Sequence, residues 1–279
     1  MSGNSSGSGE PVKVLTIAGS DSGGAAGLQA DLKTFAALGA YGMSVVTVVT
    51  AQNSEEVRAA STLPAVLVDS QLQAVLDDYG AGAVKTGFIG QPQLLELIAG
   101  RLAEYRPPFV IVDPVLVNHR GESMFPAAVT QAYRDYLLPL ATVATPNPEE
   151  AALLSGRVVS SLEDLSAAAS VIRDLGPAYV LAKGFRDGDE MVDVLAGLDE
   201  VRFFRRPLIT TENTHGSGDT LSAALCVYLA QGSELKTAVE AALNFTEEAI
   251  SRAAAWRLGR GHGPVGQFSG TEGLEEQRD

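Results

Sequence analysis

The segment Thr214 to Asp219 combines two glycines, a serine and a carboxylate directly before an apolar helical pattern. Glycines let a backbone approach an anion closely, and the N–H groups and positive dipole end of a following helix favour a phosphate there. Asp219, beside such a turn, could accept the proton of a hydroxyl that attacks a phosphoryl group. The alternative is an ordinary strand-to-helix turn in which Asp219 only caps the helix. We predict Asp219 as a catalytic base, with Gly216, Ser217 and Gly218 binding phosphate.

Polar residues that follow apolar runs elsewhere in the chain offer further chemistry. Asp113 comes directly after the run 109–112, where a carboxylate is costly unless it is paired, solvated or near a metal ion. Asn147 and Glu150 lie three residues apart at an expected helix start, so they either face one Mg²⁺ together or form a helix cap with surface glutamates. Lys183 ends another apolar run, and its ammonium either reaches nucleotide phosphates or is solvated.

The glycine-rich segment 19–27 is not a nucleotide-binding fingerprint. It lacks the G-x-G-x-x-G spacing, and no convincing acidic ribose partner follows about 20 residues later. The chain also lacks the G-x-x-x-x-G-K-[ST] phosphate loop. We interpret the segment as a glycine-lined substrate pocket whose following helix carries Asp31 inward; the alternative is a purely structural loop.

The composition restricts the class of protein. Of the 279 residues, 46% are hydrophobic and 19% are charged, which favours a folded body over a largely disordered chain. The net charge of -14 argues against nucleic-acid binding, and no apolar run reaches the roughly 18 residues of a membrane span. The single cysteine, Cys226, cannot form an internal disulfide, which favours a cytoplasmic setting.

Apolar runs typical of buried strands alternate with stretches of helical periodicity, which predicts βαβ units and a mostly parallel sheet. The clearest strands are expected at 12–18, 44–50, 109–112 and 179–182. Helices are expected at 28–38, 65–78, 93–105, 127–137 and 162–175, and two more within 219–256, separated near Gly232. The expected organisation is one domain at 12–268, after a flexible leader at 1–11 and before an acidic tail at 269–279.

The candidate residues follow the ends of these strands. Ligands of an open parallel sheet bind at the carboxyl ends of the strands, which meet at one edge. The loops expected at this edge are 19–24, 52–53, 86–88, 113–114, 145–147 and 183–184. The sequence therefore predicts a single site assembled from distant segments.

Taken together, these residues resemble the ribokinase-like superfamily, whose T-x-G-x-G-D turn matches Thr214 to Asp219. Within it, the sequence is most similar to the hydroxymethylpyrimidine and phosphomethylpyrimidine kinase family. The similarity is carried by segments 18–35, 39–42, 50–53, 113–115, 145–147 with Glu150, 183–184 and 261–265. It covers about residues 12 to 268, and its first segment is specific to this family.

The resemblance implies a ribokinase-like α/β fold with a central, mostly parallel sheet and helices on both faces. It also implies an ATP- and Mg²⁺-dependent, homodimeric kinase of thiamine biosynthesis. The small-molecule substrates are then 4-amino-5-hydroxymethyl-2-methylpyrimidine and its monophosphate.

Carried over by position, the resemblance places six residues around the pyrimidine ring: Gly19, Ala26, Asp31, Gln52, Phe88 and Val115. Gln52 is favoured for hydrogen bonds to the aminopyrimidine edge, because an amide offers both a donor and an acceptor. On the ATP and Mg²⁺ side the resemblance places Lys183, Thr211, Thr214 and Asn147 as nucleotide-binding residues, with Asp113 and Glu150 as metal-binding residues.

One position differs from the usual family pattern. Many members carry Cys where this chain has Asp219, whereas pyridoxal kinases carry Asp. An enzyme acting on pyridoxal, pyridoxine or pyridoxamine is therefore the main alternative. A non-catalytic pyrimidine-binding protein is a third interpretation, and the intact glycine turn argues against it.

Overall fold

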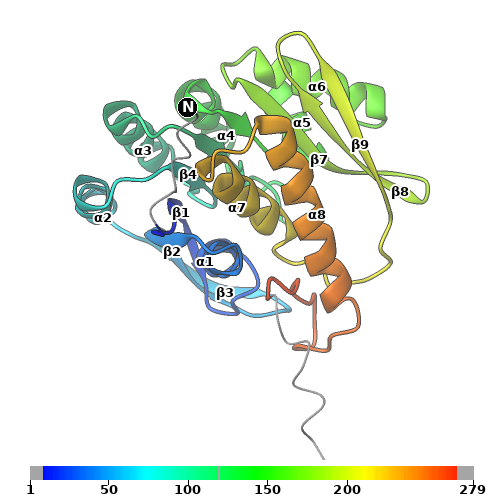
Figure 1. The fold of residues 1–279 in the computed structure, drawn as a ribbon, viewed down its shortest axis with the longest axis horizontal. Helices are drawn as coiled ribbons and strands as arrows, with labels where there is room; N and C mark the ends of the chain where they lie inside the picture. The colour runs from blue at the N-terminus through cyan, green and yellow to red at the C-terminus, as the bar shows by residue number, and fades with distance from the viewer. Residues whose placement is uncertain (1–8, 119, 269–279) are drawn as a thin grey trace, which may run out of the picture.

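The computed structural model describes residues 9–118 and 120–268, which form a nine-stranded sheet in the order β3-β2-β1-β4-β5-β6-β7-β8-β9 (Figure 1). The strands are β1 (Lys13–Asp21), β2 (Tyr41–Gln52), β3 (Val57–Thr62), β4 (Ala83–Thr86), β5 (Val110–Val112), β6 (Val143–Ala144), β7 (Tyr179–Asp187), β8 (Glu190–Ala196) and β9 (Val201–Pro207). Residues 1–8 of the expected leader and the expected tail, 269–279, lie outside the described residues.

The helices occupy the stretches that the sequence periodicity predicts, except for the helix at 148–155, of which only the start beside Asn147 was expected. They are α1 (Gly27–Ala37), α2 (Ala65–Asp78), α3 (Pro92–Tyr105), α4 (Ala127–Ala132), α5 (Pro148–Ser155), α6 (Leu162–Arg173), α7 (Ser217–Ala230) and α8 (Leu235–Ala253). The helix expected at 127–137 is interrupted, because α4 continues into a π-helical turn at Tyr133–Leu137. The expected break near Gly232 separates α7 from α8.

The six strands from β2 to β7 are parallel, and antiparallel strands flank them at both edges of the sheet. β3 pairs with β2 in antiparallel register, and β8 and β9 form an antiparallel hairpin beside β7. β3, β8 and β9 were not among the expected strands. Charged residues such as Arg202, Arg205 and Arg206 interrupt the apolar pattern of β9, and such charges are common on edge strands, where they oppose pairing with another chain.

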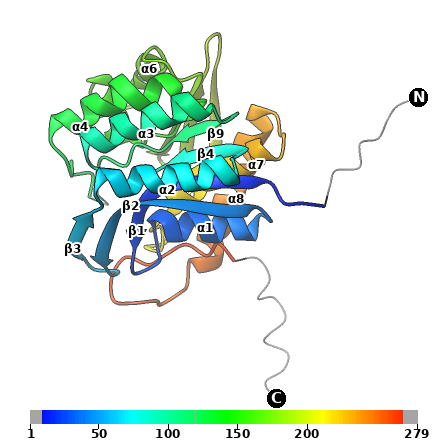
Figure 2. The same cartoon turned by 90° about the vertical axis from the view of Figure 1, so that its left-hand side faces the viewer.

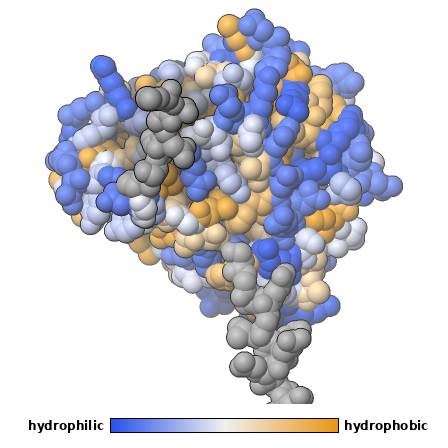
Figure 3. All heavy atoms as spheres, viewed as in Figure 1, coloured by the Kyte–Doolittle hydropathy of each residue, from blue (hydrophilic) through white to orange (hydrophobic). Residues whose placement is uncertain are grey.

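Helices cover both faces of the sheet, as Figure 2 shows. One core joins the sheet to α2, α3 and α6 through residues such as Leu72 and Leu95. A second core joins the other face to α1, α7 and α8, with Phe35 and Leu225 at its centre. Hydrophilic residues spread over the outer face of α8, with smaller hydrophobic areas beside them (Figure 3). Within the described part of the chain, no helix has both the length and the apolar character needed to cross a bilayer.

The strand order creates a cleft at one edge of the sheet. β1 lies between β2 and β4; α1, which follows β1, packs against one face of the sheet, and α3, which follows β4, packs against the other. The chain therefore leaves the neighbouring strands β1 and β4 toward opposite faces, and the loops beyond their carboxyl ends diverge. Such a point is where open α/β sheets bind ligands.

Candidate functional site

A cavity of about 510 Å³ lies at the carboxyl edge of the sheet, in line with the predicted position of the site. Its walls come from the ends of several strands and from the turn before α7. The predicted site residues that line it are Gly19, Ala26, Gln52, Phe88, Asp113, Val115, Asn147, Glu150, Lys183, Thr214, Gly216, Ser217, Gly218 and Asp219. The fold therefore brings most of the predicted set into one space, while the role of each residue stays a prediction.

The glycine turn and the segment 19–27 are in backbone contact. Gly216 caps α7 with a φ of 81°, and a Cβ at this position would lie 1.9 Å from the carbonyl oxygen of Ala25. Gly27 has a φ of 57°, and its Cβ would lie 2.4 Å from the carbonyl oxygen of Gly19. Both positions require glycine, because larger residues rarely adopt this φ and the space is filled. The Gly27 N–H donates to Asp219 Oδ2 at 3.2 Å across 192 residues of sequence.

Asp219 belongs to a cluster that the sequence did not predict, which we call the buried lysine cluster: Lys85, Asp31 and Asp219. The Lys85 Nζ lies 2.9 Å from Asp219 Oδ1 and 2.5 Å from Asp31 Oδ1. Lys85 and Asp31 have fully buried side chains, whereas that of Asp219 is 14% exposed. The Thr16 hydroxyl donates to the second oxygen of Asp31 at 2.6 Å. Of the three charged groups, only Asp219 faces the cavity.

The electrostatics of this cluster favour an ionised Asp219. Burial alone would raise the pKa of Asp219, but the charge and hydrogen bond of Lys85 outweigh it and hold this pKa below its usual range. Burial raises the pKa of Asp31 to about 7, despite the opposing attraction of Lys85. Burial alone would lower the pKa of Lys85, but the carboxylates of Asp219 and Asp31 raise it. Lys85 therefore stays charged.

Two predicted site residues lie away from the cavity. Asp31 sits behind its wall, bonded to Lys85 and Thr16, and is not a lining residue. The Thr211 hydroxyl donates to the carbonyl of Ala254 at 3.1 Å and accepts the N–H of Asn213 at 3.0 Å. Thr211 therefore holds the segment that leads to the glycine turn, and neither side chain lines the cavity.

The cavity wall contains a second cluster, which we call the open lysine cluster: Lys183, Asp113 and Glu150. The Lys183 Nζ lies 2.5 Å from Asp113 Oδ1, and its side chain is 13% exposed. Asp113 also accepts hydrogen bonds from the hydroxyls of Thr145 at 3.1 Å and Ser222 at 3.0 Å. These bonds provide the pairing that a buried carboxylate requires.

The N-terminus of α5 positions the third member of the open lysine cluster. The Asn147 side chain accepts the N–H of Glu150 at 2.8 Å, and Glu150 accepts the N–H of Asn147 at 2.9 Å, which together form a capping box. The other oxygen of Glu150 accepts the N–H of Leu116 at 3.1 Å. The predicted cap is thus present, but Glu150 is buried rather than on the surface.

Burial raises the pKa of Glu150 to about 7, although the charge of Lys183 opposes this rise. Within residues 9–118 and 120–268, no three His, Cys, Asp or Glu side chains are grouped so as to hold a metal ion. Asp113 and Glu150 thus have no third protein ligand there. Mg²⁺ commonly takes one or two carboxylates and fills its shell with water and phosphate oxygens, so this pair fits that ion.

Aromatic and amide groups line the cavity near the glycine-rich segment. The Phe88 ring packs against Phe125, with their centroids 5.3 Å apart. Gln52 Nε2 lies 3.5 Å from Nε2 of His215, whose ring stacks on His262 at a centroid distance of 5.2 Å. Both histidines also line the cavity. These flat and polar groups suit an aromatic ring with hydrogen-bonding edges.

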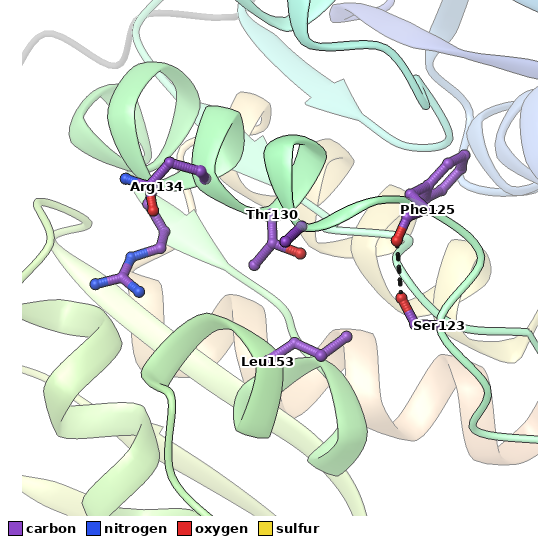
Figure 4. Close-up of a pocket in the computed structure, with 7 residues that line it drawn as sticks. Ser123, Phe125, Thr130, Arg134 and Leu153 are labelled. Carbon is purple, nitrogen blue, oxygen red and sulfur yellow. Dashed lines mark hydrogen bonds between the residues drawn. The ribbon is translucent and has the colours of Figure 1, made fainter.

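A smaller cavity of about 280 Å³ lies between the N-terminal part of α4 and α5, with Thr130, Arg134 and Leu153 in its walls (Figure 4). The Ser123 hydroxyl donates to the Phe125 carbonyl at its edge, at 3.2 Å. None of the predicted site residues lines this cavity. Because most of the predicted site residues line the larger cavity, we take that cavity as the candidate site.

Sequence reasoning missed Lys85, although a signal was present. Lys85 is the charged residue of Ala83–Thr86, a strand in which all four residues are buried. A lysine is rarely buried without a partner, so its position within an apolar run indicates a nearby carboxylate. The sequence could not identify that partner, because Asp31 and Asp219 lie on helices 54 and 134 residues away.

Comparisons with known proteins show which families and folds this chain resembles. The sequence profile of the phosphomethylpyrimidine kinase family matches residues 21–266. A hydroxymethylpyrimidine/phosphomethylpyrimidine kinase of Streptomyces coelicolor is 45% identical over 255 residues, which cover 91% of this chain and 94% of that protein. An ADP complex of Bacillus subtilis pyridoxal kinase matches with a TM-score of 0.86 at 37% identity, over 92% of this chain and 98% of that one. A phosphomethylpyrimidine kinase from Clostridium difficile matches with a TM-score of 0.77 at 38% identity, over 86% and 99%.

Proposed function

The chain belongs to the phosphomethylpyrimidine kinase family, and from this premise we propose that it phosphorylates 4-amino-5-hydroxymethyl-2-methylpyrimidine, and then its monophosphate, with ATP. The enzyme is a phosphotransferase with a ribokinase-like fold. The observation that carries the proposal is the position of Asp219. Its partly exposed carboxylate stands at the N-terminus of α7, in a cavity with Lys183 on one side and Gln52 and Phe88 on the other.

ATP binds, in this proposal, at the open lysine cluster. A Cβ added to Gly218 would lie 3.1 Å from the Lys183 Nζ, so the lysine ammonium stands directly beside the glycine turn. Together with the N–H groups at the start of α7, it offers positive charge to the transferring phosphoryl group. Phosphoryl transfer depends mainly on such positioning and charge stabilisation.

The acceptor lies, in this proposal, between Asp219 and the part of the cavity wall that Gln52, Phe88 and Val115 form. Gln52 binds the aminopyrimidine edge, and Phe88 and Val115 pack against the ring. Asp219 accepts the proton of the hydroxymethyl group as its oxygen bonds to the γ-phosphorus, and the bond from that phosphorus to the β–γ bridging oxygen breaks to release ADP. The product is the phosphate ester.

The proposal includes Mg²⁺, held through Asp113 and Glu150. When bound, this ion neutralises the negative charge of the ATP phosphates. Asp113 and Glu150 already keep fixed orientations through the hydroxyls of Thr145 and Ser222 and the N–H groups of Leu116 and Asn147. A cytoplasmic location and a homodimer also belong to the proposal, on the basis of family membership.

The test is a direct comparison of acceptors. Purified protein with ATP and Mg²⁺ is given hydroxymethylpyrimidine, its monophosphate or pyridoxal at equal concentration, and ADP release is measured. Faster ADP release with the two pyrimidines than with pyridoxal is expected. A preference for pyridoxal would contradict the proposal.

Pyridoxal kinase activity is the second candidate. The similarity to Bacillus subtilis pyridoxal kinase favours it, because that chain matches with the higher TM-score of the two structures compared. Asp219 also matches the residue that the sequence comparison associates with pyridoxal kinases. Pyridoxal carries a hydroxymethyl group on an aromatic ring as well, so one site geometry suits both acceptors.

A further inference from the structure

We propose that Lys85 is a positioning residue for phosphoryl transfer: anchored on Asp31, its ammonium holds Asp219 as an ionised carboxylate directed into the cavity. The inference rests on the proposed function, and it concerns a residue that makes no contact with the cavity itself. Three observations carry it, namely the geometry of the buried lysine cluster, its enclosure and its charge balance.

The geometry connects three elements through one ammonium. Lys85 extends from β4, Asp31 from α1 and Asp219 from the first turn of α7. The lysine donates to one oxygen of each carboxylate, at 2.5 Å and 2.9 Å. The second oxygen of Asp219 accepts the N–H of Gly27, so both oxygens are restrained. A carboxylate bound at both oxygens cannot rotate freely, which fixes its direction toward an acceptor.

The enclosure makes this arrangement persistent. Lys85 has no exposed side-chain surface, so bulk water does not compete for its ammonium. Asp31 is equally buried, and the Thr16 hydroxyl donates to the oxygen of Asp31 that Lys85 does not contact. Asp31 is therefore held in place and in turn anchors the lysine ammonium. Charge-assisted hydrogen bonds are strongest in such a poorly solvated setting.

The charge balance favours a base that is ionised before the substrate arrives. The charged groups facing Asp219 are Lys85 from β4, Asp31 from α1 and Lys183 from β7, while Asp113 from β5 acts on Lys85. Cys226, also on α7, stays neutral because burial raises the pKa of its thiol. When Asp219 accepts the substrate proton, Lys85 and Asp31 remain as a neutral ion pair, so the cluster holds no excess charge.

A merely structural role for Lys85 makes a different prediction. If Lys85 only neutralises Asp31, then removing both charges together leaves Asp219 unaffected. The pair Asp31→Asn and Asp31→Asn/Lys85→Met distinguishes the two roles, because these variants differ only in the lysine. Asp219 requires its ionised form to accept a proton, so activity is lost as the pH falls through its pKa.

We expect the Asp31→Asn variant to keep Asp219 titrating at low pH. In the pH profile of kcat/KM for Asp31→Asn/Lys85→Met, the loss of activity at low pH should begin about one to three pH units higher. Such a rise is expected for a carboxylate that loses an adjacent cation. The same rise should appear in the ¹³C NMR titration of the Asp219 carboxylate without substrate, with the signal assigned by its absence in Asp219→Asn. Lys13→Met, a matched change at an exposed lysine on β1, should leave the activity and the titration unchanged.

Identical Asp219 titrations in the two Asp31 variants would overturn the proposal. Thermal unfolding and ADP binding verify that each variant is folded, and Lys85→Gln against wild type replaces the double variant if that one does not fold. Failure of the proposed function would appear separately, as absence of phosphorylated product from the wild-type enzyme. The NMR titration does not depend on turnover and still reports on Lys85.

Discussion

The two lysine clusters have the same composition, one lysine and two acidic residues, but they differ in enclosure. In the buried lysine cluster, Lys85 is fully enclosed and bonded to both carboxylates. In the open lysine cluster, Lys183 is 13% exposed and bonded to Asp113, while Glu150 is held by backbone N–H groups. The comparison teaches that burial decides whether a lysine is committed to its protein partners or available to a ligand.

This difference assigns separate tasks to the two clusters. An enclosed ammonium can only orient a neighbouring carboxylate and keep it ionised, whereas an exposed ammonium can also contact phosphate oxygens. Mutations in the buried cluster should therefore change turnover without changing nucleotide binding. Mutations in the open cluster should change both.

The largest effect is expected from Asp219→Asn. The amide has nearly the same shape but cannot accept the proton, so kcat should fall by about 10²-fold to 10⁴-fold. The affinity for ADP, measured by isothermal titration calorimetry, should stay within about twofold of wild type, because the substitution leaves the free energy of nucleotide binding unchanged. Near-normal turnover would remove Asp219 from the base role and end the functional distinction between the clusters.

Lys183→Met is expected to lower kcat by about 10²-fold to 10³-fold, because a preorganised positive charge at the transferring phosphoryl group is lost. Unlike Asp219→Asn, it should also raise the KM for ATP and weaken ADP binding. Steady-state kinetics with varied ATP measure both. A change in kcat alone would indicate that Lys183, like Lys85, acts only by orienting a neighbour.

Gln52 belongs to neither cluster, so the Gln52→Ala variant is a control that tests binding of the pyrimidine acceptor. The Gln52 amide is expected to bind the pyrimidine edge, and a lost buried hydrogen bond costs about 1–3 kcal/mol, or roughly 5-fold to 150-fold in the KM for the pyrimidine. The KM for ATP should not change. If the KM for the pyrimidine also stays at the wild-type value, Gln52 does not recognise the ring.

The smallest effect is expected from Asn147→Ala, which removes half of the capping box that holds Glu150. Loss of an N-cap side chain lowers the free energy of unfolding by about 1 kcal/mol, as measured by urea denaturation. The KM for ATP should rise modestly as well, since Glu150 loses a restraint. Ser161→Ala, which removes the equivalent cap of α6 outside the cavity, is the matched control and should affect stability only.

Much of the fold was predictable from local patterns. The helices expected at 65–78 and 93–105 match α2 and α3 to within one residue, and the predicted break near Gly232 is present. Both β8 and β9 were missed; in β9, which forms an edge of the sheet, Arg202, Arg205 and Arg206 remove the continuous apolar signal. Local patterns therefore described the buried parallel strands better than the exposed antiparallel ones.

The site was predictable to a similar degree. Parallel strands point in one direction, so residues that follow them must share one edge of the sheet, and Asp113, Lys183 and Asp219 do line one cavity. Asp31 and Thr211 lie outside the cavity because their side chains are used to hold neighbouring groups. A residue's place in a motif does not reveal whether its side chain faces a ligand or another residue.

The sequence by itself determined the apolar periodicities, the glycine turn before α7 and the edge of the sheet where chemistry would lie. These features depend on neighbouring residues and on strand direction, both of which can be read along the chain. Only the tertiary structure decided that Lys85 joins Asp31 to Asp219. That contact requires β4 to lie beside β1 and α7 to pack on α1, and strand order and helix packing arise from the burial of surfaces distant in sequence.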